Sequence, residues 1–165
     1  MRVAVVMGSL SDLPKLESMI EILKSYDVKT DVRCLSAHRA HGKLIEFIEE
    51  VNKNGTSVII AAAGMAAHLP GVIAASTTVP VIGVPIKSTL EGMDALLAIV
   101  QMPPGIPVAT VGINAAQNAG ILAVQMLALG DADLAARFAA FKEGLKRKIE
   151  KANEELKTVS YEYKV

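Results

Sequence analysis

The sequence predicts an α/β fold in which helices cover both faces of a parallel sheet, giving a three-layer αβα sandwich. Short apolar runs at 2–7, 57–62 and 79–84 are rich in valine and isoleucine, as expected for parallel strands that are buried on both faces. The segment after the first run, "LPKLESMIEILKSY", carries its apolar side chains on one stripe, like a helix that covers a sheet. Alternation of such units predicts helices on both faces, because crossover connections are right-handed.

Two weaker runs bring the number of expected strands to five. Residues 30–35 alternate polar and apolar side chains, which suits a strand near a sheet edge, and "IPVATVGI" at 106–113 is the fifth candidate. The pattern is typical of a flavodoxin-like arrangement, whose strand order one sequence leaves open. The expected helices lie at about 13–26, 41–53, 66–77, 91–101 and 114–128.

A long helix is expected at about 131–157. Asp131 or Asp133 would cap its N-terminus. A helix of this length extends beyond a sheet whose strands have about six residues. We therefore expect its outer half to pack on another subunit; the alternative is a helix that wraps its own domain and frays. Its apolar residues recur at steps of three, four and seven: Leu134, Phe138, Phe141, Leu145, Ile149 and Leu156.

The composition is that of one compact domain over residues 1–165. Hydrophobic residues make up 52% of the chain, and no long polar or low-complexity tract interrupts it, so a substantial core is expected. Lysine plus arginine equals aspartate plus glutamate at 17 each, which predicts no broad basic surface for nucleic acid or a membrane. The expected partner is a small molecule.

The single cysteine is expected to be a structural thiol, and the first residues of the chain and its short apolar runs favour a cytoplasmic protein. Cys34 has no partner for an internal disulfide or a zinc site, and its apolar neighbours predict a buried thiol. The chain opens into "RVAVVM" without a basic region and a cleavable apolar segment. No apolar run reaches the ~18 residues that span a bilayer.

Polar motifs follow four of the expected strands. Ligands of open parallel sheets bind outside the carboxyl ends of the strands, where loops and helix N-termini present N–H groups to anions. We therefore expect a ligand site at this end of the sheet. The motifs are "GSLSD" at 8–12, "SAHR" at 36–39, "AGMAAHLPG" at 63–71 and "GVPIKS" at 83–88.

The "GSLSD" motif offers a glycine, two hydroxyl groups and a helix start, which together suit a phosphate. Asp12 could accept hydrogen bonds from a ribose diol. The alternative is a capping loop, in which Ser11 or Asp12 only satisfies the next helix. The motif is not a P-loop, because the lysine and the spacing of that signature are missing.

The "SAHR" motif combines a fixed cation with an imidazole. The guanidinium of Arg39 can hold two oxygens of a phosphate. An imidazole such as that of His38 can both give and take a proton at cellular pH, which a proton-transfer step requires. The alternative is that His38 only caps the following helix. His41 is expected to be a solvated side chain at the start of that helix.

The "AGMAAHLPG" motif mixes small residues with His68, which would expose backbone N–H groups to a carboxylate and leave room for substrate. The same composition is equally typical of a packed helix. No metal is expected, because the histidines and acids lack ligand spacing, and no Gly-x-Ser-x-Gly turn indicates an esterase nucleophile.

Together these motifs resemble the PurE family (class I), the N5-carboxyaminoimidazole ribonucleotide mutases of bacterial purine biosynthesis. The similarity covers about residues 2–128 and includes "AIVQMPPGIPVATVGINAAQNAGILA". It implies a flavodoxin-like subunit in a homo-octamer, active sites where subunits meet, and a reaction without a cofactor. In that reaction the carboxylate on N5 moves to C4 of the imidazole ring through decarboxylation and recarboxylation.

The resemblance also implies roles for individual residues. His38 would be the general acid and base, with His68 as a second catalytic residue, and Asp12 would hold the ribose hydroxyls. The 5′-phosphate would bind Ser9, Ser11, Ser36 and Arg39. The carboxylate and carbon dioxide would lie against Ala63, Gly64, Ala67, His68 and Leu69.

Two other functions stay open beside the mutase. Relatives that are 5-aminoimidazole ribonucleotide carboxylases use free carbon dioxide and tend to carry a lysine in place of Arg39, so Arg39 and His68 favour the mutase. A non-catalytic phosphometabolite-binding domain would not need a titratable His38. The chain departs from the family pattern at Ala40 and His41, where Thr-Pro is frequent, and at Met65, where glycine is usual.

Overall fold

The computed structural model describes residues 1–162 and divides the chain into two compact units, residues 1–127 and the segment from Ala128 onward. The expectation of a single domain over 1–165 stays a prediction. The elements are β1 (Arg2–Met7), η1 (Leu10–Asp12), α1 (Leu13–Ser25), β2 (Lys29–Cys34), α2 (His41–Val51), β3 (Val58–Gly64), α3 (Leu69–Ala74), β4 (Val81–Ile86), η2 (Leu90–Gly92), α4 (Met93–Val100), β5 (Ala109–Thr110), α5 (Ala116–Ala128) and α6 (Ala132–Lys157).

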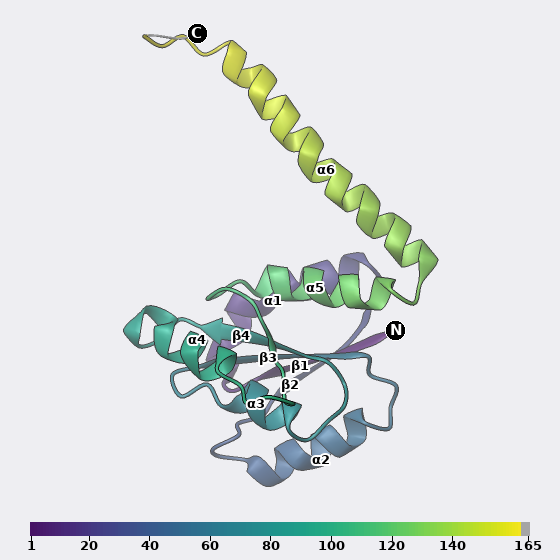
Figure 1. The fold of residues 1–165 in the computed structure, drawn as a ribbon, viewed down its shortest axis with the longest axis vertical. Helices are drawn as coiled ribbons and strands as arrows, with labels where there is room; N and C mark the ends of the chain where they lie inside the picture. The colour runs from purple at the N-terminus through teal and green to yellow at the C-terminus, as the bar shows by residue number, and fades with distance from the viewer. Residues whose placement is uncertain (163–165) are drawn as a thin grey trace. The chain divides into compact units, whose positions relative to one another are not determined.

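The strands form one parallel sheet in the order β2-β1-β3-β4-β5, which confirms the flavodoxin-like prediction. Figure 1 shows α1 and α5 on one face of this sheet and α2 and α3 on the other. On the second face, Leu44 of α2, Ile73 of α3 and Ile99 of α4 share one buried core with Ile59 of β3. The layers follow from β3 and β4, whose apolar residues are buried on both faces.

The strand β2 lies at the sheet edge, as its alternating pattern predicts, and only β1 pairs with it. The prediction of a buried Cys34 is wrong, because its side chain is exposed. Cys34 is the last residue of this edge strand, whose side chains are partly or fully exposed along its whole length. Apolar neighbours in the sequence therefore do not ensure burial at an edge.

The fifth strand is shorter than its apolar run. Only Ala109 and Thr110 pair with β4, whereas 106–113 was the expected range. Pro107 lacks the N–H that a longer ladder requires. Gly83 of β4 pairs with Thr110, and only glycine fits at this position. A Cβ atom there would lie 2.4 Å from Cγ2 of Ile99 and 3.0 Å from Cγ1 of Val108.

The second unit contains α6, which has 26 residues and therefore a length of about 39 Å. Of the two expected caps, Asp131 is the N-cap, and its carboxylate accepts a hydrogen bond of 2.8 Å from the N–H of Leu134. Leu145, Ile149 and Leu156 on its outer turns are exposed. Within residues 1–162, no helix has the length and apolar character required for a membrane span.

Candidate active site

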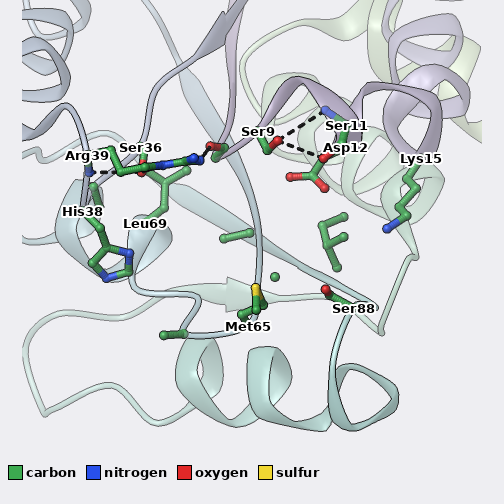
Figure 2. A pocket seen from close by; sticks show the side chains of 16 residues that line it. Ser9, Ser11, Asp12, Lys15, Ser36, His38, Arg39, Met65, Leu69 and Ser88 are labelled. Carbon is green, nitrogen blue, oxygen red and sulfur yellow. Dashed lines mark hydrogen bonds between the residues drawn. The ribbon is translucent and has the colours of Figure 1, made fainter.

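A pocket of about 630 Å³ opens at the carboxyl ends of β1, β2, β3 and β4. This is the end of the sheet that the four polar motifs indicate, and it includes the point between β1 and β3 where the strand order reverses. Figure 2 shows the side chains converging on one space. The lining residues are Gly8, Ser9, Ser11, Asp12, Lys15, Ser36, Ala37, His38, Arg39, Ala63, Gly64, Met65, Ala66, Leu69, Ile86 and Ser88.

The loop after β1 presents two hydroxyl groups to the pocket. Ser9 and Ser11 share a hydrogen bond of 2.8 Å between their Oγ atoms, and Ser9 Oγ also accepts from the N–H of Ser11 at 3.4 Å. Ser9 is the N-cap of η1, so the turn fixes both hydroxyl groups at the start of the following helices. The pair matches a site that binds an anion through hydroxyl and backbone donors.

Asp12 is buried, with 9% of the residue exposed, and lines the same pocket. Although Asp12 is the N-cap of α1, its side chain makes no capping hydrogen bond, which contradicts the capping alternative for this residue. Burial raises the pKa of Asp12, while the charge of Lys15 and a backbone hydrogen bond at Ser9 act in the opposite direction. A buried carboxylate that is not used as a cap is available to a polar ligand.

The guanidinium of Arg39 links the loops after β2 and β1. Its Nη2 donates to the carbonyl of Gly8 at 3.2 Å, and its Nε donates to Ser36 Oγ at 3.4 Å (Figure 2). The backbone N–H of Arg39 also donates to Ser36 Oγ at 3.3 Å. These contacts fix a cation beside the hydroxyl groups of Ser9 and Ser11, on the same side of the sheet.

The two histidines of different motifs meet beside the pocket. His38 Nε2 and His68 Nδ1 are 3.0 Å apart and hydrogen-bonded, with the rings in an edge-on arrangement. His38 does not cap α2, because Ala40 is its N-cap and no side chain supplies the capping bond. His41, the first residue of α2, is exposed, as predicted. The geometry therefore joins His38 to His68 and not to its sequence neighbour.

The end of β3, the loop after it and the start of α3 form the apolar wall of the pocket. Ala63, Gly64 and Leu69 line the pocket, whereas Ala67 is buried and is not among the lining residues, and the binding roles expected for all four stay predictions. His68 is also absent from the lining, and it is hydrogen-bonded to His38, which lines the pocket. Met65 lines the pocket with a φ of 57°, a left-handed conformation that glycine adopts without strain.

Sequence reasoning missed two polar lining residues, Lys15 and Ser88. Lys15 lies on α1 and donates a hydrogen bond of 3.0 Å to the carbonyl of Lys87. Its position three residues after Asp12 is the only sequence signal for it, and solvated charges on helices share that spacing. Ser88 ends the "GVPIKS" motif, which the sequence places at a strand end without a role.

The residues 1–162 contain no group of three or more histidine, cysteine, aspartate or glutamate side chains that could hold a metal ion. The polar groups of the pocket are instead a buried carboxylate, two cations, several hydroxyl groups and one imidazole. Such a set can hold an anion at fixed donors and move a proton at an adjacent point.

Comparisons with known proteins converge on one family. Residues 2–148 match the AIR carboxylase family. The chain is 49% identical over 156 residues to an N5-carboxyaminoimidazole ribonucleotide mutase of Methanocaldococcus jannaschii, covering 94% of this chain and 97% of the relative. It is 54% identical over 145 residues to a protein of the same name from Haemophilus influenzae, covering 86% and 88%. The crystal structure of Treponema denticola PurE superposes with a TM-score of 0.88 at 26% identity, covering 94% of this chain and 98% of that chain.

Proposed function

Because the chain belongs to the AIR carboxylase family, we propose that it is an N5-carboxyaminoimidazole ribonucleotide mutase of purine biosynthesis. The observation that carries the proposal is the hydrogen bond of 3.0 Å between His38 and His68, beside a pocket that also contains Arg39 and Asp12. A proton donor and acceptor thus lies next to groups suited to a ribonucleotide.

The ribonucleotide would bind through its phosphate and its sugar. Arg39, with Ser9, Ser11 and Ser36, would hold the 5′-phosphate, because a guanidinium and adjacent hydroxyl groups make charge-assisted hydrogen bonds to phosphate oxygens. Asp12 would accept hydrogen bonds from the ribose diol, which would replace the water lost when this carboxylate is buried. Both ends of the substrate would then be fixed while its ring lies near His38.

The reaction would consist of two proton transfers around the loss and recapture of carbon dioxide. His38 would protonate N5 as the bond between N5 and the carboxylate carbon breaks, releasing carbon dioxide into the pocket. C4 of the ring would then attack carbon dioxide, and the proton displaced from C4 would return to His38. His68 would orient the imidazole of His38 and share its proton across the 3.0 Å bond. No proton is gained or lost overall, as an isomerisation requires.

The apolar wall of the pocket would keep carbon dioxide in place between the two steps. Ala63, Met65 and Leu69 offer hydrocarbon surface, and Gly64 leaves space for the carboxylate close to the backbone. Exclusion of water matters here, because released carbon dioxide is otherwise diluted or hydrated. The side chain of Met65 would narrow the space that glycine leaves open in relatives.

Assembly into an octamer is part of the proposal. The apolar residues Leu145, Ile149 and Leu156 of α6 are exposed, and such a stripe on a helix of about 39 Å suits contact with another copy of the chain. The octamer itself is what the family resemblance implies.

One assay tests the function. Purified protein receives the N5-carboxylated ribonucleotide without ATP, added metal or bicarbonate, and the C4-carboxylated product is followed. The mutase proposal requires product under these conditions, and its absence would refute it. Product only from the uncarboxylated ribonucleotide with high bicarbonate would identify a carboxylase, and ligand binding without turnover would identify a binding domain.

A further inference from the structure

The backbone of Lys87, directly after β4, is held by hydrogen bonds at both its N–H and its carbonyl. Its N–H donates to Oδ1 of Asn114 at 2.9 Å, and its carbonyl accepts from Nζ of Lys15 at 3.0 Å. Asn114 is itself fixed, because its N–H donates to the carbonyl of Pro85 at 2.8 Å. Two side chains from distant parts of the sequence therefore hold the backbone of this one residue, one at its N–H and one at its carbonyl.

The loop that follows, residues 87–92, adopts a conformation that needs such support. Leu90, Glu91 and Gly92 have consecutive φ values of 42°, 57° and 86°. Replacement of Gly92 would require its neighbours to move, since a Cβ atom would lie 2.8 Å from Cγ2 of Ile113 and 3.1 Å from Cα of Lys87. Left-handed residues in series persist only where the surroundings determine them, and they cluster at ligand sites.

The held loop places Ser88 in the pocket wall. A Cβ atom built on Gly64 would lie 3.5 Å from Cβ of Ser88, so Ser88 lies beside the carboxyl end of β3. Lys15 and Ser88 line the same part of the pocket, away from Arg39 (Figure 2). Ser88 is exposed, and within residues 1–162 its hydroxyl group makes no hydrogen bond. An exposed hydroxyl group in a pocket wall, directly after a backbone held by two hydrogen bonds, is suited to contact a ligand.

We propose that Ser88 is a further substrate-contacting residue, and that Lys15 is the positioning residue that holds it by binding the carbonyl of Lys87. The inference rests on the proposed mutase function, because it assigns Ser88 to the imidazole end of the ribonucleotide, next to Gly64. The ring carries an exocyclic nitrogen and a carboxylate, either of which can pair with a hydroxyl group.

The test compares substrate KM, kcat and binding of 5-aminoimidazole ribonucleotide by calorimetry across matched variants. Ser88→Ala should raise KM about 3- to 10-fold, as expected for one lost hydrogen bond. Lys15→Met should raise it similarly, and Lys15→Arg should restore it because it keeps a donor. Ser18→Ala and Lys24→Met, which lie on exposed turns of α1 outside the pocket lining, are the controls and should leave KM unchanged.

The double variant Lys15→Met/Ser88→Ala separates positioning from direct contact. If Lys15 acts through Ser88, KM of the double variant should match that of Ser88→Ala within about twofold. If the increases in KM of the two single variants multiply in the double variant, Lys15 acts on its own, through its charge near Asp12, and its positioning role is overturned.

The results also separate this inference from the proposed function. Wild-type turnover with an unchanged KM in Ser88→Ala would overturn the role of Ser88 and leave the mutase proposal intact. Binding of 5-aminoimidazole ribonucleotide that weakens in Ser88→Ala, without any turnover by the wild type, would support Ser88 and refute the mutase. Failure of the wild type to bind this ribonucleotide would overturn both.

Discussion

Replacement of His38 by asparagine tests the proposed chemistry most directly. The pocket lining contains four ionisable side chains, those of Asp12, Lys15, His38 and Arg39. Among these residue types, only an imidazole readily both gives and takes a proton near neutral pH. His38→Asn keeps a polar side chain of shorter reach and leaves the contacts of Arg39 and Ser36 in place.

The expected loss of activity in His38→Asn follows from the separate roles of proton transfer and substrate binding in the pocket. Removal of a general acid and base lowers kcat by roughly 10²- to 10⁴-fold, which corresponds to about 3–5 kcal/mol of transition-state stabilisation. KM should change by no more than about threefold, because the groups proposed to bind phosphate and ribose are intact. His68→Asn should lower kcat by only about 3- to 10-fold if His68 merely orients His38 through one hydrogen bond.

The assay is steady-state conversion of the N5-carboxylated ribonucleotide, with ligand binding by calorimetry and circular dichroism to verify the fold. His41→Asn is the matched control, since His41 is exposed at the start of α2 and should leave kcat unchanged. A kcat for His38→Asn within about threefold of the wild type would remove His38 from the mechanism. A loss in His68→Asn as large as that in His38→Asn would show that His68 takes part in proton transfer itself.

Three further predictions concern stability, pH and assembly. Ala40→Thr should stabilise the protein by about 1 kcal/mol, which raises Tm by roughly 2–4 °C, because no side chain caps the N-terminus of α2. The control Ala40→Val has the same shape without the oxygen and should not raise Tm. Equal Tm values for the Thr and Val variants would contradict this prediction. Asp12→Asn should raise Tm at pH 7 while weakening ribonucleotide binding: burial raises the folded-state pKa of Asp12, so stability from this group is present at low pH and lost as pH rises through that pKa. The gain in Tm should shrink as pH falls through the raised pKa of Asp12 and should be gone below about pH 4, near the unfolded-state pKa of an aspartate; a gain that is the same at every pH would exclude the charge as its cause. A chain ending at Gly130, before α6, should form a smaller assembly than the full chain in light scattering; an unchanged octamer would refute the role of α6 in assembly.

Much of the candidate site was predictable because parallel sheets place the ends of all their strands together. "GSLSD", "SAHR" and "AGMAAHLPG" each follow a buried apolar run, so their meeting at one edge follows from strand periodicity and right-handed crossovers. The motifs that contain His38 and His68 follow strands of the same sheet, and in the structure the two imidazoles are hydrogen-bonded at 3.0 Å. Family resemblance added the chemistry that spacing alone leaves open.

Lys15 and Ser88 were not predictable, because their meeting depends on how a helix and a loop pack in space. Lys15 reads as one more charge on an amphipathic helix, and its bond to the Lys87 carbonyl joins residues 72 positions apart. Nothing in "STLEG" at 88–92 indicates that Leu90 and Glu91 are left-handed, since neither residue type favours positive φ.

The sequence by itself determined the layers, the strand positions and the motifs that could bind a ribonucleotide, because burial on both faces requires continuous apolar runs and because polar loops must follow them. Only the tertiary structure decided which side chains face the pocket: Asp12 and Met65 do, Ala67 does not, and Cys34 lies exposed on the edge strand. The physical reason is that the apolar pattern specifies which face of an element is buried, whereas the direction of a loop side chain depends on backbone dihedrals and on neighbours distant in the chain.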